Sequence, residues 1–319
     1  MKAKNKALFP PLIFNVNKPV RITSYDVVRH YKRHLPNGYG KIGHFGTLDP
    51  FASGVLMIGI GGAARLNDFI HEYLPKTYLA VGKLGIETPT GDYTSEISQR
   101  DDSLYLKQEI GSFSKEFIED KLKEKFLGRY MQAPHKYSAA KFMGKNLHEW
   151  AREGVEIKKE PVERFVHHIE VVKYSFPYLS VRVTVSSGTY VRTLFSDMAN
   201  FLGTLGSLIS LVREEVGKTT FRDGIKKKDW PMNKNPEFIE KGIPVQSVLP
   251  FGSFTLGEKE ARLFTNGVFL RFEQMGEFQK GMIEGDFFWI YNQEKDLLGL
   301  GEKTSNNEIK IKINFNSFE

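Results

Sequence analysis

The sequence predicts an α+β fold, in which antiparallel strand pairs lie beside separate helices and a small β-rich region follows. Residues 162–173 and 178–186 are expected to form an antiparallel pair, and alternate apolar residues from Leu179 to Val185 share one face. Residues 114–126 are amphipathic at helical spacing, yet they do not alternate regularly with strands. A doubly wound parallel sheet requires that alternation, so the pattern favours a mixed, mainly antiparallel sheet flanked by helices.

The first third of the chain predicts short strands and two helices. We expect strands at residues 12–17, 55–60 and 76–84, the second an apolar run beside glycines and the third an alternating pattern. Ser24 is expected to cap a helix that ends at His34. A second helix is expected at residues 64–73. Residues 86–112 are polar and rich in turn-forming residues, which indicates mostly loop.

Later segments predict three helices, a connecting segment and a group of short strands. We expect helices at 114–126, at 145–153 before Gly154, and at 189–202 after Gly188. Residues 226–250 are rich in Lys, Pro and Asn and are expected to connect two units. The final strands are expected at residues 268–272, 281–291, 297–301 and 308–314. This organisation predicts a large domain at 1–248, with residues 1–12 flexible, and a small β-rich domain at 249–319.

Composition excludes several classes of protein. The 319 residues are 40% hydrophobic and 26% charged, which is ordinary for a globular protein. Cysteine is absent, which excludes disulfides and thiolate zinc sites. No apolar stretch reaches the roughly 20 residues of a membrane span, and Pro10 and Pro11 interrupt the only apolar run near the N-terminus. We therefore expect a cytoplasmic protein that does not bind membranes.

The formal net charge of +7 favours a polyanionic partner, because cations that neutralise phosphates release condensed counterions. A basic protein with no such partner has the same composition. The charge therefore leaves both interpretations open, and the local motifs have to decide between them.

Residues 41–56 contain the most informative segment of the chain. Gly46 permits a tight backbone path, and Pro50 biases the preceding Asp49 towards extended geometry. One carboxylate thus lies on a constrained loop, near His44 and next to an apolar strand. The same residues also suit an ordinary turn in which Asp49 bonds its own backbone, and residue types alone favour that turn.

The segment from Gly43 to Leu56 resembles the catalytic motif G-H-x-G-T-L-D-P-x-A-x-G-V-L of the TruB family of tRNA pseudouridine synthases. Further blocks resemble that family in the same order: Lys18-Pro19 with Thr23-Ser24, Lys76-Thr77-Tyr78, Thr88–Asp92, Gln132–Gly144, Trp150–Gly154 and Gly188–Leu194. The resemblance covers roughly residues 14–224 and is weaker beyond about residue 243. As an ordered set, these blocks are highly specific.

The resemblance implies an isomerase that converts uridine to pseudouridine at position 55 in the T-loop of tRNA, without metal or cofactor. The target base would leave its stack and enter a dry pocket. The implied fold is a pseudouridine-synthase catalytic domain with a PUA-like RNA-binding domain at the C-terminus. The implied partner is the T-arm of tRNA, with a monomeric enzyme and no obligate protein partner.

The resemblance also assigns three catalytic roles. Asp49 would act on the ribose, either as nucleophile or as base. Arg192 would pair with this carboxylate and oppose its protonation by burial. Tyr78 would stack on the flipped uracil and assist proton transfer. In isolation, Arg192 also suits an exposed helical position, and Tyr78 suits the core of a sheet.

Five further residues are expected to bind the substrate. His44 would fill the gap left in the RNA by the flipped base, and Leu211 would line the base pocket. Asp92 matches an acidic position of the family, although an exposed loop aspartate is the alternative. Lys18 and Lys141 are candidates for phosphate contacts or for structural roles.

Some positions depart from the family pattern. Phe45 stands where the family usually has Thr, and His135 replaces a Pro. The run Leu211-Val212-Arg213 replaces Leu-Arg-Arg and is followed by Glu214-Glu215. These changes fall at expected RNA contacts, so they concern RNA affinity more than the reaction itself.

Two other functions suit the same motifs. A tRNA-folding chaperone with this fold would bind tRNA with little catalysis, although the retention of Asp49, Tyr78 and Arg192 favours an enzyme. The third hypothesis is that the chain is the catalytic subunit of a guide-RNA particle. The short C-terminal region, which has no long basic tail, is evidence against it.

Overall fold

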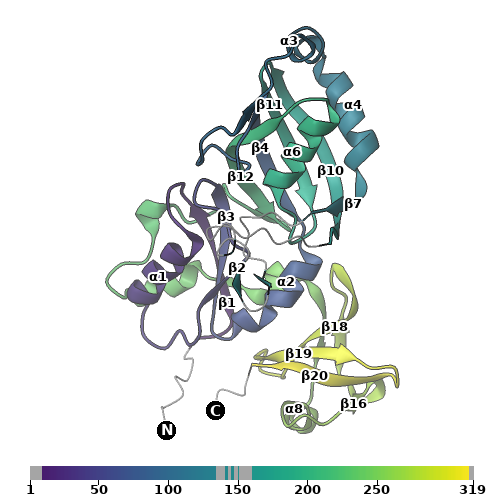
Figure 1. Ribbon diagram of the computed structural model, residues 1–319. Helices are drawn as coiled ribbons and strands as arrows, with labels where there is room; N and C mark the ends of the chain where they lie inside the picture. Colours follow the sequence, from purple (N-terminus) through teal and green to yellow (C-terminus); the bar gives the residue numbers. More distant parts are fainter. Residues whose placement is uncertain (1–8, 134–140, 143–144, 147–149, 151–159, 316–319) are drawn as a thin grey trace.

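The computed structural model describes residues 9–133, 141–142, 145–146, 150 and 160–315. A large mixed sheet with helices on its faces makes up most of this part, and a smaller sheet follows near the C-terminus (Figure 1). The predicted α+β class is therefore confirmed.

The large sheet has the strand order β14-β1-β3-β12-β4-β11-β10-β7 in the part of the chain that the structure describes. Its strands are β1 (Leu12–Lys18), β3 (Ser53–Ile60), β4 (Lys76–Leu84), β7 (Gly128–Gln132), β10 (Val162–Ser175), β11 (Tyr178–Val185), β12 (Gly206–Val216) and β14 (Ile243–Pro244). Two short strands extend it, β2 (Gly43–Phe45) beside β3 and β13 (Thr219–Thr220) beside β12. Among these described pairs only β3 and β12 are parallel, so the sheet is mainly antiparallel as expected.

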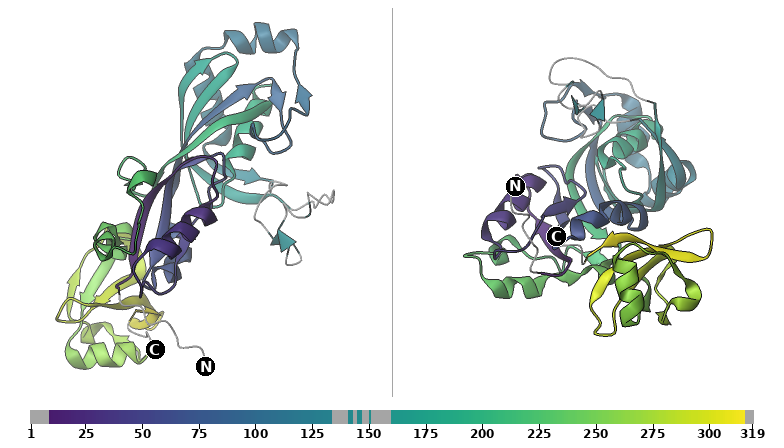
Figure 2. Two further views of the ribbon diagram at one scale, coloured as in Figure 1. Left: turned by 90° about the vertical axis from the view of Figure 1, so that its left-hand side faces the viewer. Right: turned by 90° about the horizontal axis from the view of Figure 1, so that it is seen from below.

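Strand β12 links the two halves of the sheet, and the sequence analysis did not predict it. It pairs in parallel with β3 over a short stretch and in antiparallel fashion with β4 along most of its length. Figures 1 and 2 show β1–β3 with α1 and α2 on one side of it, and β4, β10 and β11 with α4 and α6 on the other. Side chains carried by β12 therefore lie where the two halves of the sheet meet.

Four of the five predicted helices are present, with small corrections at their ends. They are α1 (Ser24–His34), a 3-10 turn η1 (Ala63–Leu66) that leads into α2 (Asn67–Tyr73), α4 (Lys115–Phe126) and α6 (Val191–Phe201). Thr23, and not Ser24, caps α1: it forms a reciprocal capping box with Asp26. This frees the Ser24 hydroxyl to bond the backbone of Leu48.

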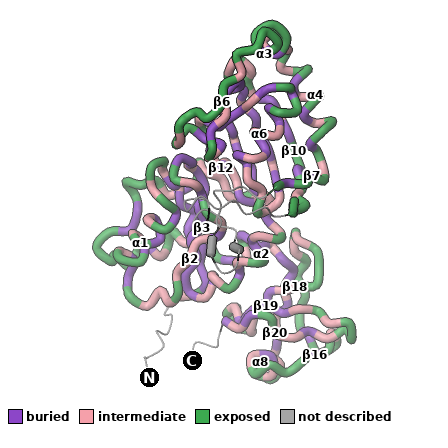
Figure 3. Tube along the Cα trace, viewed as in Figure 1, coloured by how far each residue is buried: buried purple, intermediate pink, exposed green. Residues whose placement is uncertain are grey.

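Apolar packing explains why these elements stay together. Helices α4 and α6 cover β4, β10, β11 and β12 and share one buried core with them. Helix α1 packs against β1 and β3 with Trp230 and Phe238 from a distant segment. Figure 3 shows that the central strands are buried while α3 (Leu104–Gln108) is exposed.

Two predictions need correction. Residues 86–112 were expected to be mostly loop, but they hold β5 (Ile86–Glu87), β6 (Gln99–Arg100), α3 and the 3-10 turn η2 (Ile110–Ser112). Of the helix expected at 145–153, Lys145–Asn146 is instead strand β9, because its backbone pairs in antiparallel fashion with β8 (Lys141–Phe142). Trp150 is helical, and the rest of that segment lies outside the described residues, as do residues 1–8.

The connecting segment and the C-terminal sheet complete the chain. The segment contains η3 (Lys227–Asp229), η4 (Pro236–Lys241) and α7 (Val245–Val248). The smaller sheet is formed by β15 (Phe251–Thr255), β16 (Leu270–Arg271), β17 (Glu277–Gln279), β18 (Ile283–Tyr291), β19 (Leu297–Lys303) and β20 (Glu308–Asn314), with η5 (Phe272–Gln274) and helix α8 (Glu258–Thr265). Trp289 of β18 and Phe315, which follows β20, pack in one cluster with Phe69 of α2 and Met57 of β3, so the two sheets share a core.

Candidate active site

The loop between β2 and β3 carries Asp49 on a tight turn. The backbone N–H of Ala52 donates to the Asp49 carbonyl at 3.0 Å, and Pro50 takes the second position of the turn. The turn is therefore closed by the backbone of Asp49, and its carboxylate is directed to a different partner. The loop is a turn, as the residue types indicated, but the side chain of Asp49 is not what closes it.

Two contacts from the start of α1 fix the same loop. The Ser24 hydroxyl accepts from the Leu48 N–H at 2.9 Å and donates to the Leu48 carbonyl at 3.1 Å. The N–H of Arg21 donates to the Pro50 carbonyl at 2.7 Å. The residues on both sides of Asp49 are thus bonded to the segment that precedes α1 and to its first residue.

Arg213 of β12 fixes the loop from the other side. Its side chain is almost fully buried, and Nε donates to the Val55 carbonyl at 2.7 Å while Nη2 donates to the Gly46 carbonyl at 3.0 Å. Gly54 makes this possible: its φ is +106°, and a Cβ there would lie 2.2 Å from the carbonyl oxygen of Arg213. Only glycine permits β3 and β12 to approach this closely.

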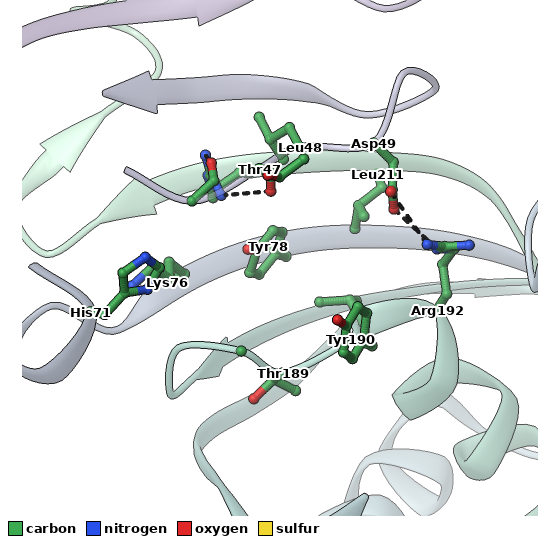
Figure 4. A pocket seen from close by; sticks show the side chains of 14 residues that line it. Thr47, Leu48, Asp49, His71, Lys76, Tyr78, Thr189, Tyr190, Arg192 and Leu211 are labelled. Atoms are coloured by element: carbon green, nitrogen blue, oxygen red, sulfur yellow. Dashed lines mark hydrogen bonds and ion pairs between the residues drawn. The ribbon is translucent and has the colours of Figure 1, made fainter. Parts of the chain in front are cut away.

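Arg192 pairs with Asp49 in a two-point contact. Its Nε lies 3.0 Å from Oδ2 of Asp49, and its Nη2 lies 3.3 Å from Oδ1, as Figure 4 shows. The third nitrogen, Nη1, donates to the Thr90 carbonyl at 2.7 Å and lies 3.4 Å from Oδ2 of Asp92. A planar guanidinium suits this arrangement, because it can bind a carboxylate with two parallel bonds and still reach further acceptors.

Gln132 of β7 holds the helix that carries Arg192. Its buried side-chain amide accepts from the N–H of Tyr190 at 2.8 Å and donates to the Tyr190 carbonyl at 3.0 Å. Tyr190 is the residue immediately before α6, and no side chain caps that helix end. The paired amide therefore determines where α6 begins and where Arg192 points.

Burial and nearby charges act in opposite directions on Asp49. Burial raises the pKa of Asp49 above its ordinary value and the neighbouring Asp92 adds to this, while Arg192 and Lys18 oppose it. The charged form is therefore disfavoured by its surroundings and retained through the ion pair. Burial also lowers the pKa of the Lys18 and Lys76 amines to about 8.

A pocket of about 260 Å³ opens beside the Asp49–Arg192 pair. Tyr78 of β4 and Leu211 of β12 line it with apolar surface, and Lys76 and His71 line it with nitrogen atoms. Figure 4 shows Tyr78 and Leu211 extending from neighbouring strands near the carboxylate. An apolar pocket with a few convergent polar groups is the usual form of a small-ligand site.

The other predicted residues occupy different environments. His44 lies on β2 and does not line the pocket; burial lowers its pKa, and its Nδ1 has no partner among the described residues. Asp92 is buried, and it accepts from the Thr94 N–H at 2.9 Å, so it is not an exposed loop residue. Lys18 is fully buried and donates to the Pro19 and Ile22 carbonyls at 2.9 Å each, which favours its structural role.

Lys141 lies in β8, and its side chain falls outside the described residues, as does His135. Phe45 is buried in the core against Gly59, so this departure from the family pattern concerns packing and not an RNA contact. Arg213 was likewise counted among the expected RNA contacts, but it is buried and bonded to the Asp49 loop.

Sequence reasoning missed four residues that shape the pocket, namely Gln132, Lys76, Tyr190 and Arg213. The first three stand inside the quoted family blocks, so their place in those blocks was the available signal. For Arg213, the signal was its place in the run Leu211-Val212-Arg213, but a buried role was not expected because an arginine is normally exposed.

Within the described part of the chain, no group of three or more His, Asp or Glu residues could hold a metal ion. No helix in this same part is long and apolar enough to cross a membrane.

Comparisons with known proteins agree with the geometry. Residues 32–191 match the model of the TruB family pseudouridylate synthase N-terminal domain. The tRNA pseudouridine synthase B of Clostridium tetani is 35% identical over 295 residues, covering 92% of this chain and 95% of the relative. That of Thermotoga maritima is 34% identical over 291 residues, covering 91% and 89%. A solved chain of a Cbf5-Nop10-Gar1 complex has the same fold, with a TM-score of 0.68, 22% identity, and coverage of 95% of this chain and 84% of that one. The chain therefore belongs to the TruB family of pseudouridylate synthases.

Proposed function

We propose that this protein isomerises uridine to pseudouridine in tRNA, at position 55 of the T-loop. Its relatives named tRNA pseudouridine synthase B cover most of its length, which supports tRNA as the substrate. The observation that carries the proposal is the paired carboxylate of Asp49, held by Arg192 at the edge of a pocket lined by Tyr78 and Leu211.

The reaction breaks the bond between C1′ and N1 of the uridine, turns the base and joins C1′ to C5. The hydrogen on C5 leaves as a proton and N1 gains one, so no oxidant or reductant is consumed. The base must first leave its stack to reach a pocket of this size. Asp49 acts on the ribose either as nucleophile or as base, and both roles require its ionised form.

The surrounding residues have distinct roles in this proposal. Arg192 keeps Asp49 ionised and oriented against the effect of burial. Tyr78 offers its ring to the flipped uracil, and Leu211 keeps water from that face. Asp92 orients Arg192. Lys18 stabilises the segment before α1, which in turn contacts the Asp49 loop. His44, which lies outside the pocket, occupies the space that the base vacates in the RNA, and Lys141 contacts a phosphate.

The proposal extends to organisation and surroundings. Residues 1–248 form the catalytic domain, with residues 1–12 flexible before β1, and residues 249–319 form a PUA-like domain that binds RNA. The enzyme works as a cytoplasmic monomer on the T-arm without a protein partner and without metal or cofactor.

The test compares the wild-type chain with Asp49→Asn on an unmodified tRNA transcript. Asparagine has the same shape and leaves Arg192 with Asp92 as its acidic partner, so the fold and tRNA binding should persist. We expect pseudouridine in the T-loop with the wild type and a loss of at least about 10³-fold in rate with the variant, as for removal of a catalytic group. Retained turnover by Asp49→Asn would refute the assignment of Asp49.

The same experiment separates the alternatives. A wild-type chain that refolds tRNA but forms no pseudouridine would be a folding chaperone. A wild-type chain that requires a guide RNA for activity would be the subunit of a particle. Thermal unfolding of Asp49→Asn, measured in parallel, confirms that any loss of activity is not a loss of the fold.

A further inference from the structure

Arg21 has an unusual backbone conformation directly beside the Asp49 loop. Its φ is +69°, and its N–H is bonded to the Pro50 carbonyl at 2.7 Å. The left-handed region is unfavourable for every side chain larger than hydrogen, and glycine would occupy it freely. Arginine therefore costs stability here, and strained residues of this kind gather at functional sites. The Arg21 side chain is exposed, so packing gives no reason for its presence.

The exposed side of α1 continues from Arg21 as a row of cations. Tyr25 is 61% exposed, and the guanidinium of Arg29, one turn later, lies 5.1 Å from the centre of its ring. Lys32 and Arg33 follow after another turn and are exposed as well. This set, Arg21, Tyr25, Arg29, Lys32 and Arg33, is called the α1 stripe below.

The α1 stripe has little compensating negative charge. Asp26 is the single acid in residues 21–34, and it contacts Arg29 at 3.2 Å, an exposed pair that contributes little. His30, on the adjacent side of α1, contacts the Pro231 carbonyl at 3.0 Å, which brings the segment that contains η3 beside the helix. Lys227 and Lys228 of η3 are exposed there, and with the exposed Asp229 they give this turn a net charge of +1.

We propose that the α1 stripe binds the phosphodiester backbone of the RNA substrate next to the flipped uridine, with Arg21 on the phosphate nearest the pocket. This proposal rests on the proposed function. The helix rises about 1.5 Å per residue, so the stripe from Tyr25 to Arg33 spans about 12 Å. That length equals the axial rise of about three to four nucleotides on one strand of a duplex, at roughly 3.4 Å each. Tyr25 supplies a ring on which an unpaired base stacks.

Three substitutions at Arg21 separate its charge from its strain. Arg21→Gln removes the charge and keeps the strained backbone, Arg21→Gly removes both, and Arg21→Lys keeps both. Losing one phosphate contact should reduce the slope of log Kd against log salt by about 0.7–0.9 and weaken binding about five- to eightfold at 0.1 M salt. We expect this from the Gln and Gly variants alike and not from the Lys variant, while Tm rises only in Arg21→Gly.

The probe is a fluorescein-labelled, unmodified T-arm stem-loop, with binding measured by anisotropy and isomerisation measured on the same RNA. The matched control is Lys107→Gln on α3, an exposed lysine at the far end of the molecule (Figure 1). Unchanged binding and salt slope in Arg21→Gln, or an equal loss in Lys107→Gln, would overturn the proposal. So would a wild-type chain that binds anionic lipid vesicles through the stripe but not the stem-loop.

This design distinguishes the two proposals. A wild-type chain that binds the stem-loop but forms no pseudouridine refutes the proposed function, while the Arg21 variants still test the stripe. If the wild-type chain isomerises the RNA and the Gln and Gly variants match it in Kd and KM, only the proposal for the α1 stripe is refuted.

Discussion

Replacing Arg213 with methionine removes the side chain that holds the Asp49 loop from the side of β12. The change deletes two well-formed bonds, to the Val55 carbonyl at 2.7 Å and the Gly46 carbonyl at 3.0 Å, and leaves both carbonyls in a buried region. Bonds from a charged donor contribute about 1.5–3 kcal/mol each, and relief of the buried charge offsets part of this. We expect a net loss of about 3 kcal/mol, or about 6–12 °C in Tm.

The assay combines unfolding with turnover. A uridine that carries tritium on C5 releases it on isomerisation, and we expect kcat to fall at least about tenfold because Asp49 loses its fixed position. Arg213 also lowers the pKa of His44, so that pKa, measured by NMR, should rise in the variant. Arg213→Lys retains the charge without the planar donor set, and Arg100→Met is an exposed control. A Tm within 2 °C of the wild type would refute this account of the loop.

Three further predictions concern the same framework. Asp92 raises the pKa of Asp49, so Asp92→Asn should lower that pKa. Because activity is lost as Asp49 protonates, the acid limb of kcat/KM should move to lower pH in a measured pH–rate profile. Gly54→Ala should cost more than about 2 kcal/mol in urea unfolding, since its Cβ meets the Arg213 carbonyl and its φ is positive. Gln132→Leu should cost about 2–4 kcal/mol and lower kcat, because two backbone groups at the start of α6 lose their partner.

Segments in which apolar residues recur at regular spacing were predicted closely from the sequence. Strand β4 has the predicted bounds, because its side chains alternate between a buried face and a partly exposed one. Helix α4 spans Lys115–Phe126, within one residue of the predicted 114–126, and Ser114 caps its start. In both cases the residues within and next to the element were sufficient to predict both its type and, to within one residue, its first and last residues.

Strand β12 was missed because its pattern is interrupted. The pairing of β12 with β4 shifts register between Leu208 and Ser210 and again between Arg213 and Glu215. Each irregularity moves the following side chains to the other face, so no simple alternation runs through the strand. A strand that joins two halves of a sheet is also defined by its neighbours, and those were separated from it by more than a hundred residues of sequence.

The electrostatics of the pocket were the hardest feature to predict, because they depend on cations that sequence rules place at the surface. Arg192, Arg213, Lys18 and Lys76 are all buried. Each is tolerated because backbone carbonyls or carboxylates satisfy its nitrogen atoms. The acceptors of Arg192 and Arg213 come from distant segments, while Lys18 and Lys76 donate to carbonyls within four residues of their own position. Burial raises the pKa of the Asp49 carboxylate, and the positive charge of Arg192 and Lys18 opposes that shift. The Asp49 loop without this framework would be an ordinary turn, as its residue types alone suggest, and the chemistry therefore belongs to the fold as much as to the motif.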